Sequence, residues 1–151
     1  MRENNIILGE RSYLSNELKK KLKNSKIQSL SKFQYDNIEN KKYNIIINSF
    51  YISIKLKKIN SYEEFFNKSL LELSKFLDKF PKSRIKKIIY TSSSAIYNSI
   101  NDLEFQDTRN RKIYSSTKFA EENLIKNFCI RNDIKFSIMR VFNIFGDKEE
   151  F

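Results

Sequence analysis

The chain of 151 residues is long enough to form one domain with a buried core. It has no histidine, which excludes Ser-His-Asp and Cys-His catalytic sites and histidine metal ligands, and its single cysteine, Cys129, excludes an intrachain disulfide. The formal net charge of +11 would suit a nucleic-acid partner, but the lysines are scattered rather than clustered, which disfavours that class.

Five short apolar segments predict β-strands, and the longer segments between them show helical spacing. The predicted strands cover residues 5–8, 26–30, 43–48, 84–91 and 135–140. Strands that alternate with helices are typical of a parallel sheet with crossover helices. We therefore predict an α/β fold, a doubly wound parallel sheet with helices on both faces, formed by one domain over residues 1–151.

Apolar residues at helical spacing predict three of the helices. Leu14, Leu18 and Leu22 should form the buried stripe of the first helix. The second helix, which ends before Pro81, and the third are marked by Phe66, Leu70, Leu73 and Leu77 and by Ala120, Leu124 and Phe128. No apolar run approaches the roughly 18 residues of a membrane-spanning helix, so we expect a soluble, cytoplasmic protein without a membrane partner.

Polar residues follow the predicted strands at their carboxyl ends. Gly9, Ser49, the serines at 92–94 and Asn143 all fall there. Doubly wound sheets bind ligands in the crevice beyond those ends. The sequence therefore predicts a binding site at this end of the sheet.

Tyr114 and Lys118 lie near the start of the third helix, and their i,i+4 spacing places them on one face. A nearby ammonium favours the phenolate, so a tyrosine, whose ordinary pKa is about 10, becomes a plausible base for an alcohol. In a lysine-rich chain this spacing also arises by chance. Tyr51 and Lys55 share it, and we interpret that pair as accidental because no serine-ending strand precedes it. For Tyr114 the alternative is an ordinary turn of a surface helix.

Three motifs in order resemble those of the NAD-dependent epimerase/dehydratase family, the extended short-chain dehydrogenases/reductases that act on nucleotide sugars. They are the strand-plus-serine segment at residues 89–97, Tyr114-x-x-x-Lys118, and the segment Arg140-Val141-Phe142-Asn143-Ile144-Phe145-Gly146. The resemblance covers nearly the whole chain. It implies a Rossmann-like fold and a nucleotide-sugar substrate in surface polysaccharide synthesis.

The resemblance also implies roles for individual residues. Tyr114 would be the catalytic acid/base, Lys118 would lower its pKa and hold the nicotinamide ribose, and Ser93 would hydrogen-bond the reacting oxygen. Asn143 would contact the substrate diphosphate, and Asn67 matches an asparagine near the cofactor. The alternative for Ser93 and Asn143 is ordinary turn chemistry after a strand.

The resemblance implies NAD or NADP as cofactor, bound by Gly9, Ser12, Tyr13, Leu14, Ser49, Asn67, Ser92, Tyr114 and Lys118. Relatives carry three glycines in the first strand-to-helix turn, whereas the aligned residues here are Gly9, Ser12 and Ser15. The alternative is a turn that binds no ligand. After the second strand, Ser31 and Lys32 stand where NAD enzymes have an acidic residue, which favours NADP.

Two segments differ in length from the family pattern. Residues 31–42 are too few for a strand and two crossover helices, so we expect one edge strand to be missing. The sequence stops at Phe151, where relatives continue into a substrate-binding domain, which fits either a fragment or a natural short form. An exposed last strand would favour association into a homodimer.

Three functions remain open at this point. The first is a nucleotide-sugar epimerase, dehydratase or reductase that uses NAD(P) and a tyrosine acid/base. The second is a non-catalytic nucleotide-binding or interaction protein that retains the fold without turnover. The third is a basic nucleic-acid binder, whose affinity would fall steeply with salt.

Overall fold

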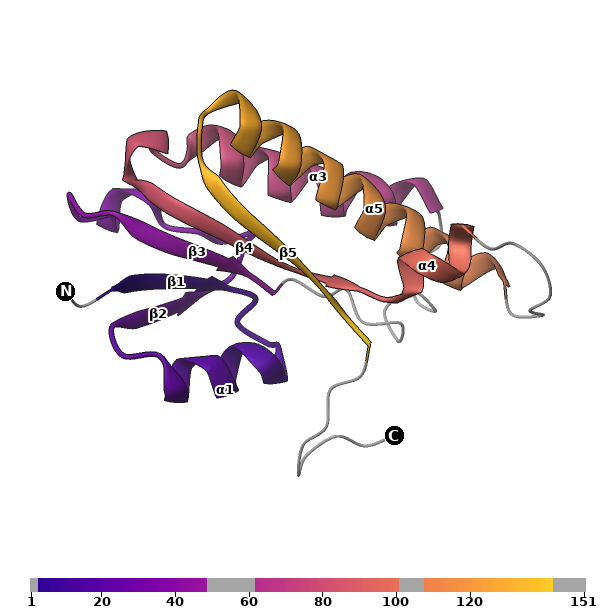
Figure 1. The fold of residues 1–151 in the computed structure, drawn as a ribbon, viewed down its shortest axis with the longest axis horizontal. Coiled ribbons are helices and arrows are strands. Elements are labelled where there is room, and N and C mark those ends of the chain that lie inside the picture. Colours follow the sequence, from indigo (N-terminus) through magenta and orange to yellow (C-terminus); the bar gives the residue numbers. More distant parts are fainter. Residues whose placement is uncertain (1–2, 49–61, 101–107, 143–151) are drawn as a thin grey trace.

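The computed structural model describes residues 3–48, 62–100 and 108–142. Its centre is a sheet of five parallel strands (Figure 1): β1 (Asn4–Leu8), β2 (Ser25–Gln28), β3 (Tyr43–Ile47), β4 (Ile85–Ser93) and β5 (Lys135–Val141). The strand order is β2-β1-β3-β4-β5. All five predicted strands are confirmed, and no end is shifted by more than two residues.

β2 lies on one side of β1, whereas the strands after β2 are added on the other side. β1 pairs with β2 on one side and with β3 on the other, so the switch point lies between β1 and β3. At such a point the two crossover connections leave in opposite directions and open a crevice beyond the strand ends. The residues that follow β1 and β3 are therefore placed to form a binding site.

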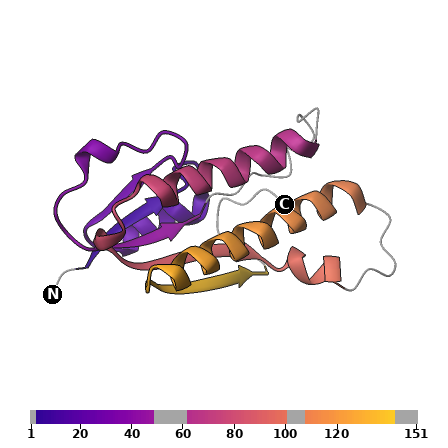
Figure 2. The same cartoon turned by 90° about the horizontal axis from the view of Figure 1, so that it is seen from above.

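Helices cover both faces of the sheet, as predicted. Figure 1 shows α3 (Tyr62–Lys79) and α5 (Thr108–Arg131) on one face and α1 (Tyr13–Lys21) on the opposite face. Seen from above in Figure 2, α3 and α5 run side by side, and the short α4 (Ala95–Ile100) packs against α5. Within the described ranges, no helix combines the length and the apolar composition that crossing a bilayer requires.

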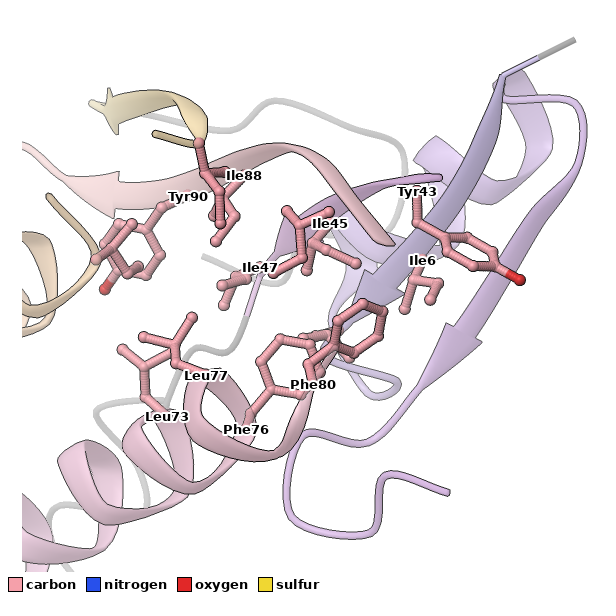
Figure 3. Close-up of a cluster of buried hydrophobic side chains, with 14 of the residues drawn as sticks. Ile6, Tyr43, Ile45, Ile47, Leu73, Phe76, Leu77, Phe80, Ile88 and Tyr90 are labelled. Carbon is pink, nitrogen blue, oxygen red and sulfur yellow. The ribbon is translucent and has the colours of Figure 1, made fainter. Parts of the chain in front are cut away.

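The hydrophobic core lies between the sheet and the helices α3 and α5. Isoleucines of β3 and β4 face the apolar side of α3, and Figure 3 labels Ile45, Ile47, Ile88, Leu73, Phe76, Leu77 and Phe80 among the buried side chains. Full burial of each such side chain contributes roughly 1.5–3 kcal/mol. Cys129 of α5 belongs to this core, and burial raises the pKa of its thiol to about 11, which suits an inert apolar residue.

Between β2 and β3, residues 29–42 contain the single-turn 3-10 helix η1 (Tyr35–Asn37) and no strand, which confirms the missing edge strand. The segment is held by its own contacts to the core. The rings of Phe33 and Phe76 meet edge to face at 5.1 Å between centroids. Arg84 Nη1 donates to the carbonyl of Ile38 at 2.7 Å. In the described part of the chain, β2 and β5 are therefore the two edges of the sheet.

The leucine stripe predicted for α1 is wrong in its position. Leu14, Leu18 and Leu22 are half-buried, and the buried residue of α1 is Ser15. Ser15 lies where α1 comes closest to the ends of β1 and β3, as its contact with Asn48 shows. A large side chain would hold the helix away from the sheet at this point, so the innermost position takes a small polar residue instead of a leucine.

Candidate active site

Gly9 marks the place where the turn after β1 approaches the end of β3. Its φ of +120° belongs to the region that side chains disfavour, and a Cβ atom there would lie 2.4 Å from the carbonyl oxygen of Asn48. The backbone N–H of Asn48 donates to the carbonyl of Leu8 at 2.7 Å, which holds the two segments together. The turn therefore requires glycine at position 9.

The two serines of the same turn make local contacts. Ser12 is the N-cap of α1, and its Oγ accepts from the Ser15 amide at a long 3.5 Å. Ser15 is fully buried, and its Oγ accepts from Asn48 Nδ2 at 3.3 Å. Tyr13 and Leu14 are the first two residues of α1, so their backbone N–H groups point out of the helix N-terminus. This arrangement fits a phosphate group.

Asn48 is a residue that the sequence reasoning missed. It is fully buried; its Oδ1 accepts from Thr91 Oγ1 of β4, and its Nδ2 donates to Ser15 of α1. One side chain thus ties β3, β4 and α1 together at the switch point. The available signal was a polar residue directly after the isoleucine run of β3.

The structure brings Ser93, Tyr114 and Lys118 together. Ser93 is the last residue of β4, and a side-chain hydrogen bond joins it to the Tyr114 phenol of α5. The Lys118 ammonium lies 6.0 Å from the centroid of the Tyr114 ring. Tyr114 is half-buried and packs near Phe65 of α3, whereas Lys118 is buried. The three groups that the motifs single out therefore form one cluster at the carboxyl end of β4.

Lys118 is held by two partners that the sequence reasoning also missed. Its Nζ donates to the hydroxyl of Tyr90 and to Glu121 Oε2, each at 2.9 Å. Tyr90 in turn donates its hydroxyl proton to the same carboxylate oxygen of Glu121. Tyr90, Lys118 and Glu121 are all buried, so this is a buried ion pair with a hydrogen-bonded phenol, and it lies next to Tyr114.

This cluster changes the expected electrostatics of Tyr114. Burial raises the pKa of Tyr114, the hydrogen bond from Ser93 lowers it, and the charge of Glu121 raises it, so the pKa lies above its ordinary value. The Glu121 carboxylate also pairs with the Lys118 ammonium at 2.9 Å, so both charges lie close to the phenol.

A second buried carboxylate, Glu122, pairs with an arginine of β5 and not with Lys118. Its two oxygens accept from Arg140 of β5, from Nε at 3.0 Å and from Nη2 at 2.7 Å. Burial raises the pKa of Glu122, but Arg140 and the Ser92 hydroxyl outweigh it, so the pKa lies below its ordinary value. Ser92 is fully buried and lies near Glu122, but its Oγ makes no hydrogen bond of normal geometry in the described part of the chain. The guanidinium also lies 4.8 Å from the centroid of the Tyr97 ring.

Asn67, another predicted site residue, does not join this cluster. Asn67 occupies an exposed position of α3, roughly 200° around the helix from Phe65, which packs near Tyr114. Ser49 and Asn143 lie outside the described residues, as do Tyr51 and Lys55. In the part of the chain that the structure describes, no group of three or more acidic or cysteine side chains is placed to hold a metal ion.

Solved structures with this fold match nearly the whole chain. A UDP-N-acetylglucosamine 4-epimerase from Methanobrevibacter ruminantium, in complex with UDP-N-acetylmuramic acid, is 17% identical with a TM-score of 0.72, over 99% of this chain and 58% of that one. MlghC, a GDP-mannoheptose C4 reductase from Campylobacter jejuni with NADP bound, is 12% identical with a TM-score of 0.69, over 99% and 55%. RMD from Pseudomonas aeruginosa, complexed with NADPH, is 15% identical with a TM-score of 0.65, over 93% and 55%.

At these identities the likeness concerns the fold, and the chain spans about half the length of the matched structures. No curated protein matches the chain. A family model does: the model of the NAD dependent epimerase/dehydratase family matches residues 6–151, which include the Gly9 turn, Ser93, Tyr114 and Lys118. The chain therefore belongs to the NAD dependent epimerase/dehydratase family.

Proposed function

We propose that the chain is the cofactor-binding and acid/base part of an NAD(P)-dependent enzyme that epimerises, dehydrates or reduces a nucleotide sugar. The observation that carries the proposal is the cluster of Ser93, Tyr114 and Lys118 at the carboxyl end of β4, in a member of this family. Tyrosine and serine hydroxyls beside a buried ammonium are suited to moving a proton to or from a sugar hydroxyl.

The turn after β1 has the features that a dinucleotide needs. The close approach of Gly9 to Asn48 leaves no room for a Cβ atom, and the N-terminal amides of Tyr13 and Leu14 suit a pyrophosphate. The Ser12 hydroxyl lies beside the same helix end. When bound there, a nicotinamide cofactor supplies hydride exchange with a sugar carbon.

The segment after β2 favours NADP over NAD. Ser29, Ser31 and Lys32 follow this strand, and no acidic residue stands among them. The hydroxyls of Ser29 and Ser31 lie 3.2 Å apart, so both face the same side of the turn. Hydroxyls and an ammonium accept a 2′-phosphate, whereas an acidic residue would repel it.

The side chains of the cluster have distinct roles in this proposal. Tyr114 holds or releases the proton of the reacting sugar hydroxyl, and Ser93 hydrogen-bonds the same oxygen. Lys118, whose ammonium lies 6.0 Å from the centroid of the Tyr114 ring, orients the nicotinamide ribose. Asn143 and Ser49 are further proposed contacts, to the substrate diphosphate and to the cofactor. The setting we propose is cytoplasmic synthesis of surface polysaccharide precursors by a homodimer.

The test compares the unmodified chain with Tyr114→Phe. Titration with NADP and with NAD, followed by calorimetry, should show binding in both proteins and tighter binding of NADP. Turnover of UDP- and GDP-hexoses, followed by chromatography, should fall by at least about a hundredfold in Tyr114→Phe because proton transfer contributes factors of that size. Absence of dinucleotide binding by the unmodified chain would remove the proposal.

One observation favours the second candidate, a nucleotide-binding protein without turnover. The Lys118 ammonium is compensated by Glu121, and the pKa of Tyr114 lies above its ordinary value because of burial and that carboxylate, with Ser93 acting against them. A protonated tyrosine is a poor base. Dinucleotide binding that is equal in both proteins, together with no turnover of any tested sugar by the unmodified chain, would favour this candidate.

A further inference from the structure

Glu121 has an unusual place for a helix carboxylate. It lies one turn after Lys118 on α5, both side chains are buried, and Nζ and Oε2 are 2.9 Å apart. Exposed Glu–Lys pairs of the same spacing occur elsewhere in the chain, as in Glu17 and Lys20. A buried pair differs from these because water does not screen its charges.

We propose that Glu121 is a positioning residue of the candidate site, which holds the Lys118 ammonium in a buried cluster with Tyr90 and thereby disfavours the phenolate form of Tyr114. The location of the site rests on the proposed function. The pairing of Glu121 with Lys118 and Tyr90 does not, because it follows from the contacts alone.

The geometry supports the proposal through the partners of Lys118. The ammonium lies 5.0 Å from the centroid of the Tyr90 ring and 6.0 Å from that of Tyr114, and its two described hydrogen bonds go to Tyr90 and Glu121. Burial raises the pKa of Tyr90 well above its ordinary value, and Glu121 raises it further. Tyr90 therefore stays protonated and donates to Glu121 while it accepts from Lys118.

The other groups around Tyr114 do not replace Glu121. From β4, Ser93 and Tyr90 face it as neutral hydroxyls, and from α3 the neighbour is the apolar Phe65. Among the α5 side chains that the structure describes, from Ile113 onward, the charged neighbours are Lys118 and Glu121, one of each sign. An ion pair with its charges 2.9 Å apart exerts a much weaker field on the phenol than the ammonium alone.

Glu122 provides a matched comparison on the same helix. It is also a buried carboxylate, but its partner is Arg140 of β5, and it is not among the groups that shift the pKa of Tyr114. Glu121→Gln and Glu122→Gln remove one negative charge each at nearly the same shape. Only the first should release the ammonium of Lys118 toward Tyr114.

The experiment is an alkaline titration of tyrosinate absorbance in the unmodified chain and in both Gln variants. Each of these three proteins is titrated with and without the additional substitution Tyr114→Phe. The difference between the two curves is the titration of Tyr114 alone, because the other seven tyrosines contribute to both curves. In Glu121→Gln, Tyr114 should ionise at lower pH, with several-fold more phenolate at about pH 9, because loss of the nearby negative charge favours the phenolate. In Glu122→Gln the Tyr114 curve should stay in place.

Two outcomes would overturn the proposal: a Tyr114 curve that is unmoved or displaced to higher pH in Glu121→Gln, or equal displacements in the two variants. Circular dichroism verifies folding. If Glu121→Gln does not fold, Glu121→Asp replaces it, since the shorter side chain withdraws the carboxylate from Nζ. It should displace the curve in the same direction by a smaller amount, and an unmoved curve would again contradict the proposal. The titration needs neither cofactor nor substrate, so a failure of dinucleotide binding affects only the proposed function.

Discussion

The two halves of the candidate site depend on different kinds of interaction. At the β1–α1 turn the backbone sets the geometry, through the φ of Gly9, its approach to the Asn48 carbonyl and the amides of the α1 N-terminus. At the β4–α5 corner, side-chain charges set the chemistry, with Lys118 paired to Glu121 and Arg140 paired to Glu122.

This difference teaches which changes each half tolerates. The turn is held with serines at positions 12 and 15, because Ser12 caps the helix and Ser15 hydrogen-bonds Asn48. The corner keeps its fold as well, but one carboxylate, Glu121, changes the charge that Tyr114 experiences. The turn after β1 therefore tolerates side-chain substitutions that bring no Cβ atom against the backbone. In the buried charge cluster, by contrast, each added or removed charge changes the pKa values of its neighbours.

The strongest way to break the comparison is Gly9→Ala. The new Cβ would lie 2.4 Å from a backbone carbonyl oxygen, at a φ that side chains disfavour, so neither partner can move aside cheaply. We expect a loss of about 3 kcal/mol in the free energy of unfolding, from strain and overpacking together. Urea denaturation followed by circular dichroism measures it.

The control for Gly9→Ala is Ser12→Ala in the same turn. It removes the N-cap hydroxyl without any backbone clash, so its cost should be about 1 kcal/mol. If both substitutions cost the same, the backbone does not determine the turn, and the contrast between the two halves of the site is lost.

The charged corner is tested by Glu122→Gln. Breaking a fully buried ion pair costs roughly 3–5 kcal/mol, but the Arg140 side chain is 26% exposed, so we expect about 2 kcal/mol. The pKa of Glu122 lies below its ordinary 4.5 because Arg140 and Ser92 outweigh burial, so its contribution is complete above about pH 4.5 and is lost as pH falls through the folded-state value.

The stability difference between the unmodified chain and Glu122→Gln should therefore shrink on acidification. Urea denaturation at a series of pH values below neutrality measures this dependence. Glu17→Gln removes one partner of an exposed pair and should leave stability unchanged within error. A difference from Glu122→Gln that stays constant down to about pH 3 would show that the carboxylate charge does not hold the corner together.

Much of the fold could be predicted because its signals are local in the sequence. The isoleucine run of β3 indicates a buried strand without knowledge of the strands beside it. The few residues between β2 and β3 leave no room for another strand with its crossover helices. The position of Ser15 could not be predicted in the same way. Its burial depends on how closely α1 approaches Asn48, which is a contact between distant parts of the chain.

In the candidate site, too, the features with a local sequence signal were predicted and those that depend on long-range packing were missed. The i,i+4 spacing of Tyr114 and Lys118 and the serine at the end of β4 predicted that these groups meet. Glu121 was missed because the apolar spacing of α5 was traced through three residues that are only half-buried: Ala120, Leu124 and Phe128. The buried stripe instead runs through Ile113, Thr117, Glu121, Ile125 and Cys129.

A lysine and a glutamate three residues apart usually indicate a solvated pair, as Glu72 and Lys75 do on α3. Sequence spacing is identical in the exposed and the buried case. What distinguishes Lys118 and Glu121 is Tyr90, which β4 presents opposite them from 28 and 31 residues earlier in the chain. Only the packing of α5 on the sheet reveals this contact.

The smallest expected effect sharpens the backbone half of the comparison. Ser12→Gly removes a Cβ atom at the helix N-terminus where a pyrophosphate is proposed to bind, and glycine still serves as an N-cap. Stability should fall by only a few tenths of a kcal/mol, while affinity for NADP should rise several-fold because the phosphate can approach the α1 amides more closely. Calorimetric titration measures the affinity. Ser12→Ala keeps the Cβ atom and should show no such gain, whereas equal losses of affinity in both variants would mean that the Ser12 hydroxyl, and not the backbone alone, holds the phosphate.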